Sequence, residues 1–592
     1  MTYRAPLADI GSALKHAATL TPAIEQGLFG ELGLDDIDAI VGEAGRFATE
    51  VIAPLNRIGD TFGTRFSDGK VTTAPGWKEA YRDWRLGGWN AVTAPAEWGG
   101  QGLPQIVNAA CTEMWHAASV AFANGPMLTM AAIDALNAHG SETLKRAYLN
   151  KLVSGEWMGT MQLTESQAGS DVGALRTRAE RAGDGSYRIT GQKIFITFGE
   201  HDFTDNIIHF VLARLPDAPP GTRGISLFLV PKFLLQVDGS LGPRNDVRAH
   251  SVEHKLGIHG SPTCTMVFGD AGGATGFLVG EENAGMQCMF TMMNRARLAV
   301  GLQGVGIAEC ATQKAVAYAR ERRQGRAPGT DAAQAAAIIA HPDVRRMLLT
   351  MRALTQAARA ICYATALAID RSERGGDDKV RHQAHAQASL LTPVAKAFST
   401  DVANEVASLG IQVHGGMGFI EETGVAQLFR DARIAAIYEG TNGIQAIDLI
   451  TRKLPLGDGS FVNAHLNELR SVVRALEADN DPGFGWTAVR LRDAVESLGR
   501  ATNWIIAGLG KEPEAALAGA TPYLRLFGLA SGGCLLAKQA LSMKRLGTDA
   551  VAALATARFF AEHAVVASGG LERTVVEGAA SVNGADAALA MP

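Results

Sequence analysis

The residues "SYRITGQKIFIT", Ser186 to Thr197, decide how this chain is built. β-branched and aromatic side chains fill the run, and residues that favour turns bound it, which is typical of a strand. Two runs of the same kind follow, "NIIHFVLARL" and "GISLFLVPKFLL". Clusters of glycine, proline and aspartate separate the three runs. We therefore predict a β domain over residues 159–283.

The segments on both sides of this domain follow the helical period instead. Upstream, apolar residues recur at helical spacing from Ile37 to Ile52, behind the possible caps Asp35 and Asp36. Pro54 is expected to end that helix. Downstream, long apolar-periodic segments predict helices over 285–326, 341–371 and 391–409.

A turn-rich stretch, "LPLGDGS" from Leu454 to Ser460, is a plausible linker to a last Ala- and Leu-rich helical region. A chain of 592 residues is too long for one simple core. We predict an α+β fold of four domains. They are a helical N-terminal domain (1–158), a β-barrel or sandwich (159–283), a helical C-terminal bundle (284–455) and an additional helical domain (461–592).

Composition narrows the function classes. Hydrophobic residues make up 47% and charged residues 19% of the chain, as in globular enzymes. A net charge of -5 argues against a nucleic-acid or anionic-membrane partner. The six cysteines are far apart without a C-x-x-C pair, so neither a metal site nor a disulfide framework is indicated, and a reducing cytoplasm suits them. We find no signal peptide and no apolar run long enough to span a membrane.

Two stretches combine residue types that carry chemistry. "LTESQAGSDVGALRTRA", Leu163 to Ala179, is either a polar turn or a loop whose hydroxyls and N–H groups face a phosphate or a polar ring edge. "AIYEGTNGIQ", Ala436 to Gln445, sets Glu439 between an apolar run and a glycine-rich turn. Glu439 is either a surface acid that ends an element or a base held in a dry pocket.

Three further motifs stand in order with these two: "GQKIFIT" (191–197), "HKLGIHGSPTC" (254–264) and the stretch 297–326 that ends in "ERRQGR". The last motif extends upstream to "QVHGGMGF", so that it covers 412–445. Together the five motifs resemble the acyl-CoA dehydrogenase family over residues 35–455, and the extra C-terminal region resembles a long subgroup of that family. The resemblance implies a C-terminal four-helix bundle, FAD as cofactor, and α,β-desaturation of an acyl-CoA to the trans-2-enoyl-CoA.

The resemblance also assigns roles on the substrate side. Glu439 is expected to be the catalytic base, with its backbone N–H donating to the thioester oxygen and with hydride passing to flavin N5. Such a base needs a pKa near the working pH, which for a carboxylate means a raised value. Gly440 leaves room for the thioester. Asn294 and Arg297 are expected at the acyl-CoA channel, and Ser170 at the flavin pyrophosphate close to the CoA chain. The preceding Met289, Phe290, Met292 and Met293 are either core residues or part of the acyl tunnel.

Flavin contacts follow from the same resemblance. Leu163 and Thr164 are expected at the pyrimidine edge of the ring system, and Phe195 and Thr197 on its face near N5. Phe195 can also be read as a core aromatic residue of a strand. The expected contacts to FAD of a neighbouring subunit are Arg322, Gln324, Gln412, Gly415 and Gly416, with Thr441 and Gly443 touching the same cofactor. The cluster around Arg322 has a second reading, a solvated cationic helix end.

This chain departs from the family pattern at two positions. Ser166 replaces the proline of the T-E-P segment, which should loosen that turn. Gly325 stands where many relatives carry phenylalanine, which puts part of the adenine contact in doubt.

The expected partners are an acyl-CoA, an electron-transfer flavoprotein and a second copy of the chain, since cross-subunit contacts require at least a dimer. An acyl-CoA oxidase and a flavoprotein scaffold or nucleic-acid binder are the alternatives. The acyl group stays open between a 3-methylthiopropanoyl chain, a short unbranched chain and longer fatty chains.

Overall fold

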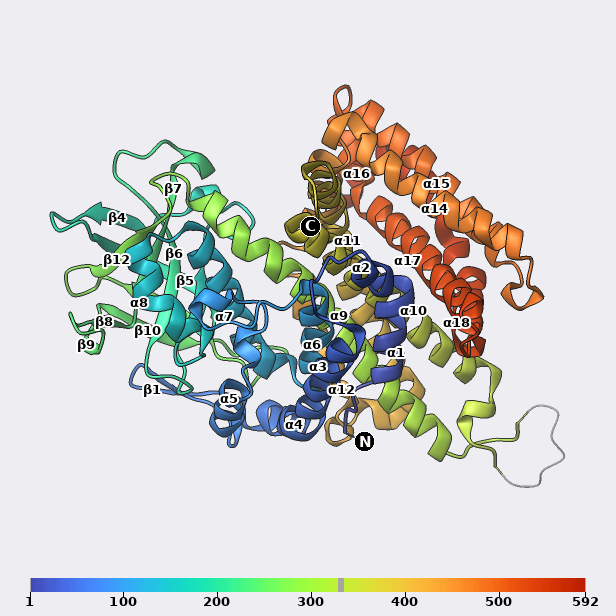
Figure 1. Ribbon diagram of the computed structural model, residues 1–592, viewed down its shortest axis with the longest axis horizontal. Coiled ribbons are helices and arrows are strands. Elements are labelled where there is room, and N and C mark those ends of the chain that lie inside the picture. The colour runs from blue at the N-terminus through green and yellow to red at the C-terminus, as the bar shows by residue number, and fades with distance from the viewer. Residues whose placement is uncertain (1, 328–334, 591–592) are drawn as a thin grey trace. The chain divides into compact units, whose positions relative to one another are not determined.

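The computed structural model describes residues 2–327 and 335–590. The chain divides into two compact units, drawn together in Figure 1. Unit 1 comprises Met1–Arg46, Gln105–Ala117 and Arg297–Pro592, and unit 2 comprises Phe47–Pro104 and Ala118–Ala296.

Unit 2 is built on one eight-stranded sheet. Its strands are β3 (Met158–Gln162), β4 (Arg178–Arg181), β5 (Tyr187–Thr197), β6 (Ile207–Arg214), β7 (Ile225–Pro231), β10 (Val247–Val252), β11 (Thr263–Phe268) and β12 (Ala274–Val279). The order is β10-β11-β5-β12-β7-β6-β3, with β4 pairing β5 and β6. The run that opened the sequence analysis is β5, the longest of these strands. Neighbouring strands are antiparallel except for β3 with β6 and β4 with β6. The predicted β domain is confirmed.

Helix α7 (Val120–His139) covers this sheet at β3 (Figure 1). The amide of Gly159 donates to Thr129 Oγ1 at 3.1 Å. A Cβ on Gly159 would lie 2.5 Å from the Cβ of Ala132, so glycine is needed for this close approach. The other helices and short strands of unit 2 are α4 (Ala53–Phe62), α5 (Trp77–Leu86), α8 (Glu142–Val153), β1 (Arg65–Ser67), β2 (Lys70–Thr72), β8 (Phe233–Leu235) and β9 (Leu241–Arg244).

The prediction that Pro54 ends the first long helix is wrong. Helix α3 (Leu34–Phe47) passes through a π-helical turn, Ala48–Ile52, directly into α4. Pro54 stands in the first turn of α4, where a missing N–H costs nothing because the first amides of a helix have no intrahelical partner.

Long helices form unit 1. They are α6 (Gln105–Ala118), the greater part of α9 (Gly285–Glu321), α10 (Pro342–Arg374) and α11 (Asp378–His414). The three helices predicted downstream of the β domain are present, but α9 ends earlier than predicted and α11 is longer at both ends. The short helices of this unit are α1 (Leu7–Ser12), α2 (Leu20–Glu25), α12 (Val425–Ala432), α13 (Asn442–Asp448), α16 (Pro513–Ala518), α20 (Ala579–Asn583) and α21 (Asp586–Leu589).

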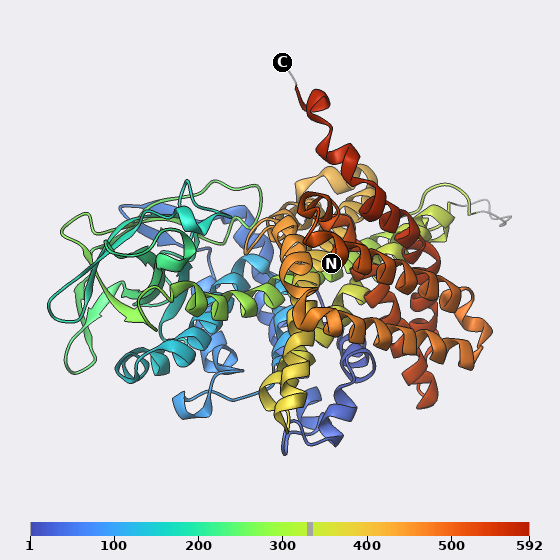
Figure 2. The ribbon, with the colours of Figure 1, turned by 90° about the horizontal axis from the view of Figure 1, so that it is seen from above.

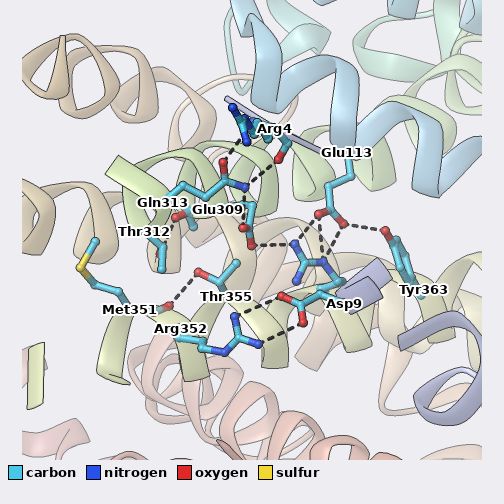
Figure 3. Close-up of polar contacts among 12 residues, drawn as sticks. Arg4, Asp9, Glu113, Glu309, Thr312, Gln313, Met351, Arg352, Thr355 and Tyr363 are labelled. Atoms are coloured by element: carbon cyan, nitrogen blue, oxygen red, sulfur yellow. Dashed lines mark hydrogen bonds and ion pairs between the residues drawn. The ribbon is translucent and has the colours of Figure 1, made fainter. Parts of the chain in front are cut away.

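A buried ionic network joins three of these long helices (Figure 3). Glu113 of α6 and Glu309 of α9 both accept from the Arg359 guanidinium of α10, at 2.6 and 2.9 Å. Tyr363 donates to the second oxygen of Glu113 at 2.7 Å. The Glu113 and Arg359 side chains are fully buried, so breaking this network would leave an uncompensated charge in the interior. It therefore fixes α9, the helix that carries Arg297.

The C-terminal region folds as the predicted helices (orange to red in Figure 2). They are α14 (Ser460–Asp479), α15 (Thr487–Leu509), α17 (Ala520–Arg545), α18 (Val551–His563) and α19 (Ser568–Glu577). Helix α17 packs on α10 and α11. A Cβ on Gly528 would lie 2.3 Å from the Phe398 ring of α11. The C-terminal helices thus share a core with the preceding bundle, and the fourfold division of the chain stays a prediction.

Within the described residues, one helical stretch meets the length and composition of a membrane span, although we read none from the sequence. It is Val551–Glu577, within which an 18-residue window has a mean hydropathy of 1.2 and is 33% buried. It includes α18, a 3-10 turn and α19. Core helices of soluble proteins pass the same test, so this is weak evidence for a membrane.

Candidate active site

Glu439 stands in a sharp turn between two helical segments of unit 1. The chain leaves a 3-10 helix at Ala436 and enters α13 at Asn442. In between, Glu439 has a φ of 55° and Gly440 a φ of 84°. Left-handed backbone costs a non-glycine residue about 1–2 kcal/mol, so the surroundings must hold Glu439 in this conformation.

Side chains from three helices hold this turn. Tyr438 OH donates to Gln303 Oε1, Gln445 Nε2 donates to the Glu439 carbonyl at 3.5 Å, and Lys396 Nζ donates to the Gly440 carbonyl at 2.9 Å. Gly440 is required here, because a Cβ would lie 2.5 Å from the Gln445 amide. The turn is therefore anchored on both sides of Glu439.

Glu439 is half-buried, and desolvation of its carboxylate is the largest influence on its pKa. Burial raises the pKa of Glu439, and the positive charges of Arg297 and then Lys396 oppose that rise. Burial likewise lowers the pKa of Lys396, to about 8. Since desolvation outweighs both cations, the carboxylate is shifted toward the pH range in which a base exchanges protons.

Arg297 lies on α9 with 6% of its surface exposed. Its guanidinium is 3.7 Å from the Asp448 carboxylate at the end of α13. Asn294 precedes Arg297 by about one helical turn and is exposed. Met289 and Met292 are fully buried and belong to the core.

The predicted cross-subunit residues gather at one end of the unit 1 bundle. Stacking of Tyr318 of α9 on His414 of α11, with centroids 4.4 Å apart, places the ends of these two helices side by side. Immediately after α9 the backbone of Gln324 pairs with Ala336 at 3.0 Å. Gly415 ends α11 with a φ of 58°. The exposed residues at this end include Arg322, Gln324, Gln412, Gly415 and Gly416.

In unit 2 the loop that begins at Leu163 lies against strand β5. The Thr164 carbonyl accepts from the Ile194 amide at 2.9 Å. Lys193, fully buried on β5, donates to the Leu163 carbonyl at 3.0 Å and to Glu165 at 2.8 Å. Leu163 and Thr164 are thereby fixed beside β5, on which Phe195 and Thr197 also lie.

Glu165 closes the same loop from the other side. Its carboxylate accepts from the amides of Arg176 and Thr177, at 2.7 and 3.1 Å, and from Thr177 Oγ1 at 2.6 Å. These bonds and Lys193 lower the pKa of Glu165 to about 2 against its burial. The turn around Ser166 is pinned further by paired backbone bonds between Glu165 and Ala168. The freedom that serine adds in place of proline is therefore restrained.

Phe195 is 60% exposed and has a φ of 60°, so it is not a core residue. A phenyl ring held in a strained backbone conformation next to Leu163 and Thr164 offers an aromatic face and polar groups at its edge. Thr197 is half-buried two residues further on, and Ser170 is exposed in the loop. This arrangement of unit 2 residues fits the flat, partly polar ring system of a flavin.

Sequence reasoning did not name the residues that hold these groups. Lys396, Gln303 and Gln445 around Glu439, and Lys193 under the flavin loop, were missed. One signal was available: Lys396 stands in the apolar run "LLTPVAKAFST" of a predicted helix, where a lysine must be buried and paired. Nothing in the sequence indicated the acceptors of these side chains.

Family models match almost the whole chain. The matching descriptions are acyl-CoA dehydrogenase, N-terminal domain (residues 35–156), middle domain (160–271), C-terminal domain (283–454), and acetyl-CoA dehydrogenase C-terminal like (466–586).

Three known proteins illustrate the similarity. A 3-methylmercaptopropionyl-CoA dehydrogenase of Ruegeria pomeroyi is 47% identical over 96% of both chains. A butyryl-CoA dehydrogenase of Syntrophomonas wolfei is 34% identical over 95% of both. The crystal structure of an acyl-CoA dehydrogenase from Bacillus anthracis in complex with FAD superposes on 95% of this chain and on 92% of its own chain. The TM-score is 0.74 at 20% sequence identity, which supports the fold.

The order of the motifs and the α+β architecture agree with these matches. The chain therefore belongs to the acyl-CoA dehydrogenase family of FAD-dependent oxidoreductases, in the form that carries an additional C-terminal domain.

Proposed function

We propose that this dehydrogenase acts on 3-methylthiopropanoyl-CoA, or a short acyl-CoA of similar size, and forms the trans-2-enoyl-CoA. The name of the Ruegeria pomeroyi relative, together with its similarity over the whole length, supports this substrate. The observation that carries the reaction is the geometry at Glu439: a carboxylate whose pKa burial raises, in a turn anchored on both sides.

Glu439 removes the proton from the carbon next to the thioester. A carboxylate with its ordinary pKa is a weak base for such a proton, and desolvation strengthens it. The Glu439 N–H stabilises the charge that develops on the thioester oxygen, in the manner of an oxyanion hole. Arg297 and Lys396 oppose the rise that burial causes in the pKa of this carboxylate, because both cations favour its charged form. Gly440, Asn294 and Arg297 bind the thioester arm.

FAD when bound accepts the hydride that leaves the next carbon. In unit 2, Leu163, Thr164, Phe195 and Thr197 hold its ring system, and Ser170 its pyrophosphate. Thr441 and Gly443 contact the FAD of the neighbouring subunit. The exposed cluster at the ends of α9 and α11 holds the FAD diphosphate and adenosine of a neighbouring subunit, with Arg322 as the bidentate phosphate ligand. Its members are Arg322, Gln324, Gln412, Gly415 and Gly416.

This assignment makes the active unit at least a dimer. We place the reaction in the cytoplasm, in agreement with six free, buried cysteines, and propose an electron-transfer flavoprotein as electron acceptor.

The substrate proposal is tested by anaerobic titration of flavin absorbance with a panel of acyl-CoAs. We expect bleaching at the lowest concentration and the highest rate with 3-methylthiopropanoyl-CoA. A preference for butanoyl-CoA would instead favour the second candidate, a short straight-chain dehydrogenase, which the Syntrophomonas wolfei relative supports. Absence of bleaching with every acyl-CoA would contradict the proposed reaction.

The oxidase alternative needs a separate measurement. Oxygen uptake with acyl-CoA and no added acceptor, at a rate that matches turnover with an electron-transfer flavoprotein, would establish an oxidase. Slow uptake is expected for a dehydrogenase.

A further inference from the structure

A buried lysine lies directly beneath the turn of Glu439. Lys396 is at the middle of α11 and is fully buried. Its ammonium group donates to the Gly440 carbonyl and to Asn442 Oδ1, each at 2.9 Å. Gly440 directly follows Glu439 and Asn442 is the first residue of α13, so one side chain holds the turn on the side that leads into this helix.

Asn442 is itself locked between a cation and an anion. Its Oδ1 accepts from Lys396, and its Nδ2 donates to Asp401 Oδ1 at 2.7 Å and to Thr400 Oγ1 at 2.9 Å. The orientation of this amide is therefore determined by its partners. The chain of contacts Lys396, Asn442 and Asp401 links α11 to the start of α13 through groups of fixed polarity.

The charged groups around this chain come from several helices. Arg297 of α9 and Lys396 of α11 act on Glu439, and Asp401 of α11 acts on Lys396. Asp401 in turn is influenced by Arg525 of α17 and by Arg433, which precedes the turn. Among these charged groups, Lys396 both donates hydrogen bonds to the turn and favours the charged form of Glu439.

We propose that Lys396 is a positioning residue for the reaction: it holds the turn in which Glu439 adopts its left-handed backbone, and its positive charge favours the ionised form of the Glu439 carboxylate. The inference rests on the proposed role of Glu439 as base. It adds a buried side chain that acts on the base through the turn, by its two hydrogen bonds and by its charge.

Different variants distinguish the positioning role of Lys396 from the effect of its charge. Lys396→Met removes the charge and the donors, Lys396→Arg keeps the charge and alters the geometry, and Asn442→Ser removes the second acceptor and leaves the charge. Lys538→Met is the matched control, since Lys538 is a half-buried lysine of α17 whose pKa burial also lowers, beside Glu468. All are measured as holoenzyme, by stopped-flow flavin reduction with the acyl-CoA that bleaches the wild type, over a range of pH.

Removing an opposite charge close to a carboxylate raises its pKa by about one unit or more. Lys396→Met should therefore move the acid limb of the rate profile upward by about one pH unit and lower the plateau rate by about tenfold to a hundredfold. Lys396→Arg should keep the limb and lose part of the rate, and Asn442→Ser should lose rate without moving the limb. Lys538→Met should match the wild type.

Hydrogen exchange of the peptide over 437–445 gives a readout independent of turnover. It should quicken in Lys396→Met and Asn442→Ser but not in Lys538→Met. A wild-type limb and rate in Lys396→Met, or a limb shift in Lys396→Arg as large as in Lys396→Met, would overturn the proposal. If Lys396→Met does not fold, Lys396→Gln, which also removes the charge, takes its place in the pH profile, and Asn442→Ser tests positioning. Failure of the proposed function is distinct, because the wild type itself would then show no reduction by any acyl-CoA.

Discussion

Glu439 and Phe195 share a backbone conformation that neither residue type favours. Their φ angles are 55° and 60°, in different units of the chain. Such residues persist where the surrounding structure over-determines the backbone, and seven other described non-glycine residues of this chain also have a positive φ. The two residues are also the ones that the motifs assigned to the base and to the flavin face. Local strain and motif position, which are independent observations, thus agree at both residues.

Replacing Glu439 by glutamine should abolish flavin reduction. Glutamine keeps the size and the backbone requirement of glutamate but cannot accept the proton, so we expect the reduction rate to fall by at least about a thousandfold. FAD content and the melting temperature of the variant should equal those of the wild type. In the wild type the rate should rise with pH through a pKa above the ordinary carboxylate value, since burial raises that of Glu439. Unchanged bleaching in the variant would refute the role of this residue.

Replacing Lys193 by methionine should cost both stability and FAD retention. The change leaves Glu165 buried next to β5 without its cation and frees the Leu163 carbonyl. Breaking a buried ion pair by removing one partner costs about 3–5 kcal/mol. We expect a lower urea midpoint and less flavin per chain after gel filtration. In the double variant Lys193→Met/Glu165→Leu much of the stability lost through the unpaired charge should return. A single variant that equals the wild type in both measurements would contradict this account of the loop.

At the scale of elements, a carboxylate from α10 caps the N-terminus of helix α6. Asp370 accepts from the amides of Gln105 and Ile106, the first residues of α6, at 2.7 and 2.8 Å. Burial nevertheless raises the pKa of Asp370 to about 7. A helix start is a good place for an anion, but here the cost of desolvation exceeds that benefit.

This makes the stability of the bundle depend on pH with a definite sign. Between the unfolded pKa of 3.8 and the folded pKa of about 7, the folded chain binds one more proton at Asp370 than the unfolded chain. Stability therefore falls as pH rises through that window, by an amount on the order of a few kcal/mol. Asp370→Asn should flatten this part of the profile, measured as urea midpoints at several pH values. Asp343→Asn, an exposed aspartate of the same helix, is the control, and parallel profiles for Asp370→Asn and wild type would contradict the assignment.

The sequence predicted some helices and strands well and missed other features of them. Alternating and helical periods predicted β5 and the long helices, because burial of one face leaves a pattern in the sequence. The π turn before Pro54 was missed, since nothing local distinguishes a helix that ends from one that widens and continues. The partners of Lys396 and Lys193 could not be predicted for a related reason. A motif names the residues that react, whereas the carbonyls and amides that hold them are set by tertiary contact.

At the scale of the whole molecule, the added helices are part of the core and not an appendage. His465 of α14 stacks on Phe527 of α17 at 5.0 Å, and Arg525 of α17 bonds Glu405 of α11 at 2.9 Å. Gly528 of helix α17 also packs against the Phe398 ring of α11. The bundle that carries Glu439 and Lys396 is therefore completed by a region that the catalytic motifs do not include.

The proposed cross-subunit cofactor contact predicts complementation between two inactive chains. Glu439→Gln lacks the base, and Arg322→Ala lacks the proposed phosphate ligand, which is exposed just after α9. If Arg322 serves the cofactor of the other subunit, a mixed dimer contains one doubly defective site and one intact site. Co-expressed and tag-purified mixed dimers should then recover up to about half of the wild-type flavin reduction per dimer, while each parent dimer stays nearly inactive. If Arg322 instead serves the cofactor of its own subunit, both sites of the mixed dimer are defective and no activity returns. Recovery thus requires both a dimer and a contact across it, whereas a mixed dimer as inactive as its parents, with FAD retained in the Glu439→Gln parent, would exclude the cross-subunit assignment.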